Sequence, residues 1–352
     1  MRKVWPIFTI FASAVMLVAV PWFAVGAHAA DPVPGKVVEL SIAHHVGVKH
    51  HLHSSAWQPL ADEINRESKG RIKATVYPGA ALGKPDAELD LCQKGAIDIA
   101  MIYPIYTPSR FPLSDVVSLP FAIPSAEAGV KVVSKLIEKK LLDSALTDRV
   151  IGLWGTTSPY QFFLGKKVTK YEELKGLRLR SPGGLMTKSL EALGAVPMAV
   201  PGAEFQNAFE RGVIDGGVVD YGSGPGYKLD EYTKQVIVAN MGVTMNGVVM
   251  NKAKYDSLPK DLQKVIDNAM RNFIKNNADS FDKADRESSK VFEKAGIPIL
   301  HLTGAEKARW MKVTEPVYSN WLKDTKQKGL PAEETYQEFK RLMKEYGTEL
   351  PL

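Results

Sequence analysis

The sequence predicts an α/β protein built as two lobes of related design. Short strand-like segments alternate with helical segments after residue 36, which is typical of α/β units. One pattern occurs once in each half, as PDAELDLCQKGAID (85–98) and PGAEFQNAFERGVID (201–215). In both copies a helix face, a cation and a glycine suited to a helix end precede a strand that opens with Ile-Asp. Residues 259–295 predict a helix of roughly 50 Å, long enough to lie across both lobes.

The first thirty residues predict an export leader and not part of the fold. Arg2 and Lys3 precede an apolar run, and the small residues of AHAA follow it. A positive start, an apolar middle and a small-residue end are the signature of a signal peptide, here cleaved near Ala29 or Ala30. The alternative is an uncleaved membrane anchor, because the run is long enough to span a bilayer.

Composition limits the classes of protein to consider. Roughly 322 residues remain after the leader, enough for two lobes. Cys92 is the only cysteine, so no disulfide can form within the chain. The formal net charge is +6, of which Arg2 and Lys3 contribute two, and no basic block suggests nucleic acid. No second apolar stretch approaches membrane-spanning length. The composition therefore predicts a soluble globular protein of the periplasm or the exterior.

The elements follow in order along the chain. Alternating β-branched residues predict a first strand at 37–45, and a helix with Trp57, Leu60, Ala61 and Ile64 on one face follows from about Ser54. A second strand is IKATVY (72–77). Asp86 is expected to cap a short helix that ends at Gly95, before a buried strand at 96–103. Helices at 304–327 and 332–346 complete the chain. The expected division is 1–30 leader, 31–157 with 246–284 lobe I, and 158–245 with 285–352 lobe II.

Enzyme signatures are absent from the sequence. It contains no G-x-S-x-G, no H-E-x-x-H and no G-x-x-x-x-G-K-[ST]. The glycines of YGSGPGY (221–227) lack the spacing of a dinucleotide site, and a flexible loop explains them better. We therefore expect no enzyme and no cofactor. An enzyme acting on a small carboxylic acid is the first alternative.

Five of the seven histidines lie in HHVGVKHHLH (44–53). His50 and His53 could share a helix face and bind a metal, but no cysteine or downstream carboxylate–histidine pair completes such a site. A histidine-cluster metal-binding protein is the second alternative, and we expect no metal. His44 ends the first strand, where open α/β sheets bind ligands, and is the better candidate for ligand contact.

Aromatic residues and one arginine follow other strands. Tyr103, Tyr106, Trp154 and Tyr160 are each compatible with a core role, but together they could line a cleft. Arg178 and Arg180 are two places apart on a strand, so they should point the same way. The strand ends at once in Ser-Pro-Gly-Gly. A guanidinium there offers a planar fork of donors that matches the two oxygens of a carboxylate.

Six sequence blocks occur along the chain in an order and spacing that resemble one family. They are KGRIKATVYPGAALG (69–83), KGAIDIAM (94–101), LPF (119–121), ELKGLRLRSPG (173–183), ALGAVPMAVPGAEF (192–205) and RGVIDG (211–216). The blocks are similar to the substrate-binding subunits of tripartite ATP-independent periplasmic (TRAP) transporters, the DctP-like family. The resemblance covers essentially the whole chain after the leader. It implies a two-lobed periplasmic binding protein fold with a hinge, crossing strands and a long lobe-spanning helix.

The resemblance also implies site residues. Members hold the ligand's carboxylate with an arginine at the position of Arg180, while Arg178 is expected to be solvated. Positions that are acidic, basic or amidic in sialate-binding relatives carry apolar or aromatic residues here, namely Pro85, Tyr103, Tyr106, Tyr160 and Val219. Gly202 stands where those relatives carry phenylalanine, and so predicts extra space. The Glu-Trp pair of a metal-assisted subgroup is replaced by Val218 and Val219. Asp215 and Asp220 leave open an amine or hydroxyl on the ligand.

The function implied is capture of a small organic acid, without catalysis. The walls suit a carboxylate with a hydrophobic or aromatic body, held by Arg180 between lobes that close about a hinge. The expected ligand-binding set is Arg180, His44, Tyr103, Tyr106, Trp154, Tyr160, Gly202, Val219 and Asp220. The expected partners are a small carboxylate and the subunits of a TRAP membrane permease, with the receptor itself a monomer in the periplasm.

Overall fold

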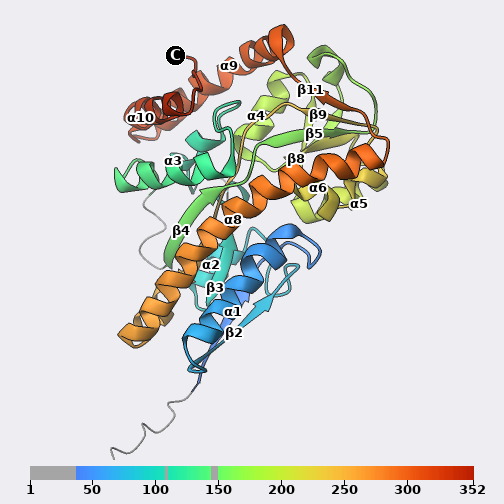
Figure 1. Ribbon diagram of the computed structural model, residues 1–352. Coiled ribbons are helices and arrows are strands. Elements are labelled where there is room, and N and C mark those ends of the chain that lie inside the picture. The colour runs from blue at the N-terminus through green and yellow to red at the C-terminus, as the bar shows by residue number, and fades with distance from the viewer. Residues whose placement is uncertain (1–36, 108–109, 144–149) are drawn as a thin grey trace, which may run out of the picture. The chain divides into compact units, whose positions relative to one another are not determined.

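Two β-sheets carry the fold of the computed structural model, which describes residues 37–107, 110–143 and 150–352 (Figure 1). The first sheet has five strands in the order β2-β1-β3-β10-β4. Its strands are β1 Val38–Ala43, β2 Ile72–Tyr77, β3 Ile99–Ile102, β4 Val150–Thr156 and β10 Met245–Asn251. β1 is parallel to β2 and β3, whereas β10 is antiparallel to β3 and β4.

The second sheet has six strands in the order β11-β9-β5-β8-β6-β7. Its strands are β5 Tyr160–Leu164, β6 Arg178–Ser181, β7 Val196–Ala199, β8 Gly216–Asp220, β9 Gln235–Val238 and β11 Ile299–His301. β6 is parallel to both β7 and β8, and β5 is antiparallel to β8 and β9. Each sheet thus contains a parallel part, and both parallel parts contribute loops to the site described below.

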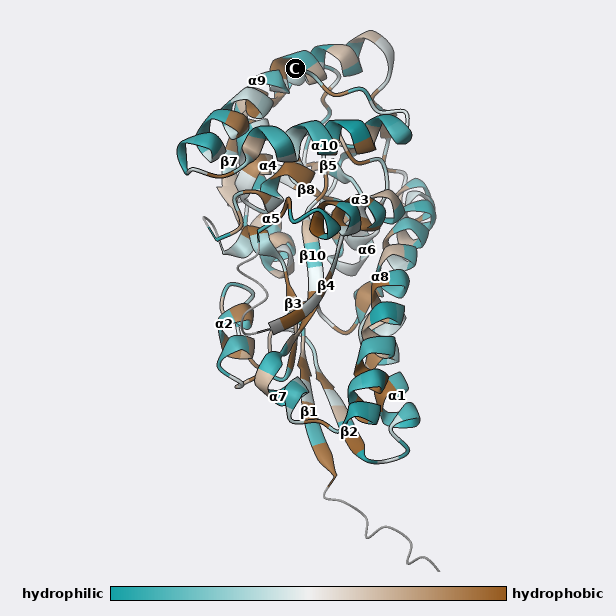
Figure 2. Cartoon of the chain, turned by 90° about the vertical axis from the view of Figure 1, so that its left-hand side faces the viewer, coloured by the Kyte–Doolittle hydropathy of each residue, from teal (hydrophilic) through white to brown (hydrophobic). Residues whose placement is uncertain are grey.

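Helices cover the sheets and bury apolar faces against them. They are α1 Gln58–Glu67, α2 Glu88–Gln93, α3 Ala126–Glu138, α4 Gly184–Ala192, α5 Phe205–Glu210, α6 Ser223–Gly226, α7 Lys252–Asp256, α8 Lys260–Lys294, α9 Gly304–Gln327 and α10 Ala332–Glu345. Hydrophobic colouring is prominent on the strands, whereas α8 and α10 are largely hydrophilic on the sides seen in Figure 2. This contrast is expected when a helix buries one stripe and leaves the rest in water.

The predicted mixed α/β architecture is confirmed, and most predicted elements lie where the pattern placed them. The face of Trp57, Leu60, Ala61 and Ile64 is buried, each side chain at most 1% exposed. A π-helical turn at His53–Trp57 leads into α1. The long helix of the tail is one helix, α8, with 35 residues. The boundaries drawn between the two lobes stay a prediction.

The internal repeat corresponds to two equivalent units, one in each sheet. α2 leads into β3 and α5 leads into β8. The aspartate of each Ile-Asp accepts a hydrogen bond from the main chain of the neighbouring parallel strand, Asp98 from Ser41 N (2.8 Å) and Asp215 from Arg178 N (2.9 Å). The sequence similarity therefore reflects a shared way of fixing the start of a strand against its neighbour.

The chain passes between the sheets through two extended crossings and α8. The residues after β4 and before β10 hydrogen-bond to each other, with Thr157 N donating to Thr244 O (2.9 Å) and Tyr160 N to Gly242 O (2.7 Å). α8 starts beside α1 in the first core, and near its other end Phe292 is buried in the core of the second sheet. The expected crossing strands and the long helix that spans the lobes are confirmed.

Two local predictions are wrong. Asp86 does not cap α2, because the residue before that helix is Ala87 and no side chain caps it. The glycines at 221–227 form the helical turn α6 instead of a flexible loop. Gly222 is needed there for close approach, since an added Cβ would lie 2.5 Å from the Cβ of Ala284 in α8.

The predicted leader, residues 1–30, lies outside the described residues. In 37–107, 110–143 and 150–352, none of the helices combines the length and apolar character required to cross a bilayer. Cys92 is buried and unpaired, and burial raises the pKa of its thiol to about 12.

Candidate functional site

A cavity of about 690 Å³ lies where the parallel strands of both sheets end. Loops after β1, β2 and β3 form part of its wall, and loops after β6, β7 and β8 form another part. One residue from each of these loops, in that order, is His45, Ala80, Tyr106, Pro182, Val200 and Tyr227. This is the position at which open α/β sheets bind ligands, because the connections there diverge and expose main-chain groups and side chains.

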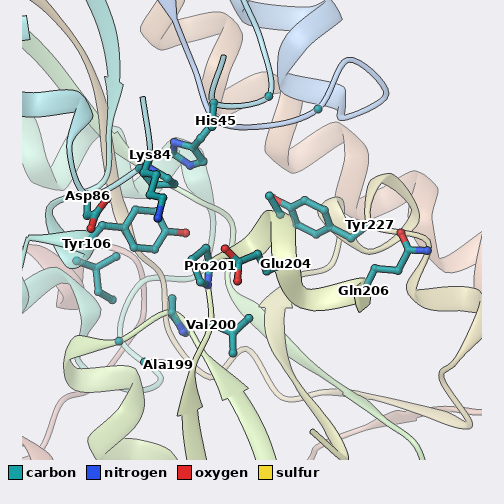
Figure 3. A pocket seen from close by; sticks show the side chains of 18 of the residues that line it. His45, Lys84, Asp86, Tyr106, Ala199, Val200, Pro201, Glu204, Gln206 and Tyr227 are labelled. Atoms are coloured by element: carbon teal, nitrogen blue, oxygen red, sulfur yellow. The ribbon is translucent and has the colours of Figure 1, made fainter. Parts of the chain in front are cut away.

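The wall is mostly aliphatic and aromatic, with few charges. Ile105, Tyr106 and Tyr227 supply apolar area. Lys84, Asp86 and Glu204 also line the cavity, so one cation faces two carboxylates there. Figure 3 shows His45, Lys84, Asp86 and Tyr106 on one side, and Val200, Pro201 and Glu204 on the facing side. An apolar body therefore finds more contact in this cavity than a doubly charged anion does.

Arg180 is buried beside this cavity, with a side chain 1% exposed. Its Nε donates to the carbonyl of Val200 and its Nη1 to the carbonyl of Val218, each at 2.7 Å. The guanidinium carbon lies 5.7 Å from the ring centre of Phe205. Arg180 itself does not line the cavity, but its acceptor Val200 does. The two carbonyls and the ring therefore fix the plane of the guanidinium directly behind the cavity wall.

No carboxylate among the described residues forms an ion pair with Arg180. A buried cation without a counter-ion costs several kcal/mol of desolvation, of which two hydrogen bonds from a charged donor return about 1.5–3 kcal/mol each. Asp220 is the acid whose pKa responds to Arg180, because the guanidinium charge lowers that pKa slightly. Burial nevertheless dominates and raises the pKa of Asp220 to about 6, although Ser223 donates to its Oδ1.

A group of tyrosines links the cavity to Arg180. Burial is the main cause that raises the pKa of Tyr103, Tyr160 and Tyr227, and each is raised further by neighbouring hydroxyls and by Asp220. The charge of Arg180 opposes these shifts and lowers the pKa of Tyr160 and Tyr227. Tyr106 and Tyr227 line the cavity, while Tyr103 and Tyr160 lie behind it. Two of these tyrosines thus face the cavity, and two lie buried behind it.

His45 and Glu88 form a second buried polar pair at the cavity. Nδ1 of His45 lies 2.8 Å from Oε2 of Glu88, and the two side chains are 5% and 1% exposed. Burial raises the pKa of Glu88, and His45 opposes that shift. The other carboxylate oxygen of Glu88 is buried without a hydrogen-bond partner in the described part of the chain. The edges of Tyr103 and Tyr106 approach the imidazole, with ring centres 5.4 and 5.5 Å away.

Each remaining histidine of the cluster has a hydrogen-bond partner of its own. His44 does not line the cavity; it packs on Trp57, and its Nε2 lies 3.0 Å from Nδ1 of His53. Burial lowers the pKa of His44 to about 3. His50 bonds to Ser223 (2.8 Å) and His51 to Ser280 (2.6 Å). Across the described residues, histidines, cysteines and acids form no group of three or more that could hold a metal.

Three other predicted site residues lie away from open space. Trp154 belongs to the core of the first sheet and Val219 to a core cluster of the second. Gly202 is buried, but the space predicted there is filled by Tyr227. A Cβ on Gly202 would lie 2.8 Å from the Tyr227 hydroxyl and 3.2 Å from its Cζ.

Arg178 faces solvent, as expected, but it also has a partner. Its Nη2 lies 2.7 Å from Oδ1 of Asp215, and its Nε 3.1 Å from Oδ2. Both side chains are partly exposed. Asp215 is therefore occupied by the neighbouring strand, and it does not line the cavity.

Sequence reasoning missed His45, Glu88 and Tyr227 as site residues. Signals for two of them existed, because His45 follows β1 and Tyr227 follows β8, where ligands bind in such sheets. The sequence pattern favours His44, because it stands at the end of that strand. Glu88 reads as one charge on an amphipathic helix, and only the fold brings it to His45.

Comparison with known proteins places this architecture in one family. The family model DctP, described as bacterial extracellular solute-binding protein, family 7, matches residues 42–324. The chain belongs to this family. Its relatives include the C4-dicarboxylate-binding periplasmic protein DctP of Rhodobacter capsulatus, 27% identical over 264 residues, which are 71% of this chain and 77% of that protein.

Solved structures share this fold, and the match covers nearly the full length of each solved chain. One is a TRAP solute-binding protein of an unidentified marine microbe, described as specific for aromatic acid ligands. It is 30% identical, with a TM-score of 0.83 over 88% of this chain and 100% of that chain, in complex with meta-hydroxyphenylacetate. The marine protein is also known with 3-hydroxybenzoate. Another is a TRAP solute-binding protein of Rhodoferax ferrireducens T118 with copurified benzoate, 25% identical, TM-score 0.83, covering 88% of this chain and 99% of that one.

Proposed function

We propose that this solute-binding protein captures an aromatic monocarboxylate, clamps its carboxylate with Arg180 and delivers it to a TRAP permease. The observation that carries the proposal is a buried guanidinium, fixed by two main-chain carbonyls, with no carboxylate partner among the described residues. A carboxylate can supply the missing charge through a bidentate pair. Tyr106 supplies wall for the ring, and Tyr103 and Tyr160 support it from behind.

The chemistry of the wall favours an aromatic acid over a C4-dicarboxylate. Among the described residues that line the cavity, Lys84 is outnumbered by Asp86 and Glu204, so a second ligand carboxylate would gain little. The tyrosines and Ile105 instead offer faces on which a ring can pack, and aromatic pairs contribute about 0.5–1.5 kcal/mol beyond the area they bury. The relatives with hydroxyphenylacetate, hydroxybenzoate and benzoate support the same ligand class.

Capture requires the two lobes to open and close. The crossings at 157–159 and 239–244 are short main-chain segments at which a hinge can act. We infer that export by the leader at 1–30 brings the protein to the periplasm, where the closed form docks on the permease as a monomer. His44, Trp154, Gly202, Val219 and Asp220 then support the site from behind the residues in contact with the ligand.

A thermal-shift screen of the purified protein tests the ligand class. Aromatic monocarboxylates such as benzoate and 3-hydroxybenzoate should raise the melting temperature, since a ligand at a hundred times its Kd stabilises by about 2.7 kcal/mol. Succinate and malate at the same concentration should have little effect. Stabilisation by the dicarboxylates alone would contradict the aromatic proposal.

Replacement of Arg180 tests the clamp. Arg180→Ala should weaken binding of the best acid from the screen at least tenfold by calorimetry, because truncating one partner of a buried charged pair costs about 2–5 kcal/mol. Arg180→Lys keeps the charge without the planar fork and should fall between wild type and alanine. The matched control is Arg178→Ala on the same strand, which should bind like wild type. Equal affinities of the two alanine variants would refute the clamp.

A further inference from the structure

The buried pair of His45 and Glu88 is not explained by carboxylate binding or by the fold. Glu88 lies at the start of α2, and His45 lies in the loop after β1. Packed apolar residues could join these elements with less desolvation, since burying a carboxylate and an imidazole costs free energy that apolar side chains do not. One oxygen of Glu88 is left without a partner in the described part of the chain. An unpaired buried polar atom lowers stability, and such departures are common at sites that bind a ligand.

The arrangement makes His45 a directed hydrogen-bonding group. Glu88 Oε2 accepts from Nδ1, which places the lone pair of the neutral ring on Nε2. Within the described residues, Nε2 has no hydrogen-bond partner, and His45 lines the cavity. The rings of Tyr103 and Tyr106, which also pack on each other, both pack against the imidazole, so its orientation is set before a ligand arrives.

His45 and the Arg180 anchor belong to opposite walls. In Figure 3 His45 projects into the cavity from the side opposite Val200, whose carbonyl holds Arg180. A ligand with its carboxylate on the Val200 side therefore presents its other end to His45. Because Nε2 is an acceptor, that end gains a hydrogen bond only if it carries a donor.

We propose that His45, oriented by Glu88, selects aromatic acids that carry a hydroxyl group on the end remote from the carboxylate. This inference rests on the proposed function and specifies its ligand. The hydroxyl donates to His45 Nε2, and an acid without a hydroxyl leaves that acceptor buried and unpaired. A site built to bond a polar group discriminates against ligands that lack it more strongly than an apolar pocket does.

Calorimetry with two probe acids tests the selection. Wild type should bind 3-hydroxybenzoate at least tenfold more tightly than benzoate. His45→Phe keeps an aromatic ring and removes the acceptor, so it should bring the ratio of the two affinities to within threefold, mainly through a loss of 3-hydroxybenzoate affinity. If His45→Phe does not fold with Glu88 left unpaired, the double variant His45→Phe/Glu88→Gln removes that charge and should show the same ratio.

The ratio separates selection from a structural role. If the pair only joins β1 to α2, the substitution should lower the affinity for both acids by the same factor. The ratio would then stay as in wild type, and that result would overturn the inference. Equal binding of the two acids by wild type would also overturn it while leaving the proposed function intact. If wild type bound neither acid, the proposed function would fail, and the inference with it.

Discussion

At the scale of single residues, two arginines of one strand have different roles because of what lies beside them. Arg178 begins β6 next to the Asp of the repeated Ile-Asp, and the two form an exposed ion pair. Such pairs contribute about 0–1 kcal/mol. Arg180 lies near the end of the strand, where the neighbouring strands present carbonyls instead of carboxylates. Arg180 is therefore buried with carbonyl partners only, and its positive charge remains able to pair with an anion.

Gly202 has a defined role at the same scale, because its missing side chain makes room for Tyr227. Gly202→Ala should weaken binding of 3-hydroxybenzoate roughly tenfold, since the new Cβ pushes the Tyr227 hydroxyl from its position in the wall. Adding Tyr227→Phe removes the nearest atom and should restore part of the affinity. Calorimetry of both variants checks this. Unchanged binding by Gly202→Ala would show that Tyr227 moves aside without consequence.

At the scale of elements, α8 connects the other helices as well as the two sheets. Its Asp282 accepts from the main-chain nitrogens of Ala126 (2.9 Å) and Glu127 (3.0 Å) at the start of α3. Ser125 accepts from Ala128 N at the same end. The free donors of the first turn of α3 are therefore satisfied partly from another helix. Three residues further along α8, Asp285 accepts from Gly222 N (2.6 Å) beside α6.

Removing the carboxylate at position 282 should destabilise the protein measurably. Asp282→Ala should lower the free energy of unfolding by about 1–2 kcal/mol in urea titrations, the usual cost of losing a helix cap. The matched control is Asp279→Ala, one turn earlier on α8, whose exposed carboxylate pairs with Lys275. The control should change stability by about 0.5 kcal/mol at most. Similar losses in both variants would argue against the cap.

At the scale of the whole molecule, two sets of buried groups oppose each other as the pH changes. Burial lowers the pKa of His44 and His51 to about 3, so their contribution to stability is present above pH 6.5 and is lost as the pH falls below that value. Burial raises the pKa of Asp220 to about 6 and of Asp115 to about 7. The contribution of these acids is present below pH 3.8 and is lost as the pH rises through the folded values.

Asp220→Asn isolates one of these contributions. The amide keeps the acceptor for Ser223 N, but it does not ionise. Relative to wild type, the variant should therefore gain stability as the pH rises from 4 to 7, by on the order of 2–3 kcal/mol. Urea unfolding of the ligand-free proteins across this range measures the difference. Asp62→Asn on the exposed side of α1 is the control, and a difference that stays constant with pH for Asp220→Asn would contradict the prediction.

Periodicity determined much of this fold without any structure. The apolar face of α1, the uninterrupted α8 and the repeated helix–strand unit are local patterns, so these elements and the division into two related lobes were predictable. The position of Arg180 at a strand end was predictable for the same reason. The cap of α2 and the turn at 223–226 were not, because neighbouring segments decide them.

The sequence by itself determined the α/β class, the helix–strand unit that occurs once in each half, the long helix and the arginine at a strand end, since each depends on residues a few positions apart. Only the tertiary structure decided that His45 and not His44 faces the cavity, that Glu88 orients it, and that Tyr227 fills the place left by Gly202. Those relations join residues 25 to 43 positions apart, whose distances depend on how the strands pair and the loops cross. The sequence gives the chemical character of each side chain, whereas the fold determines which other side chain it contacts.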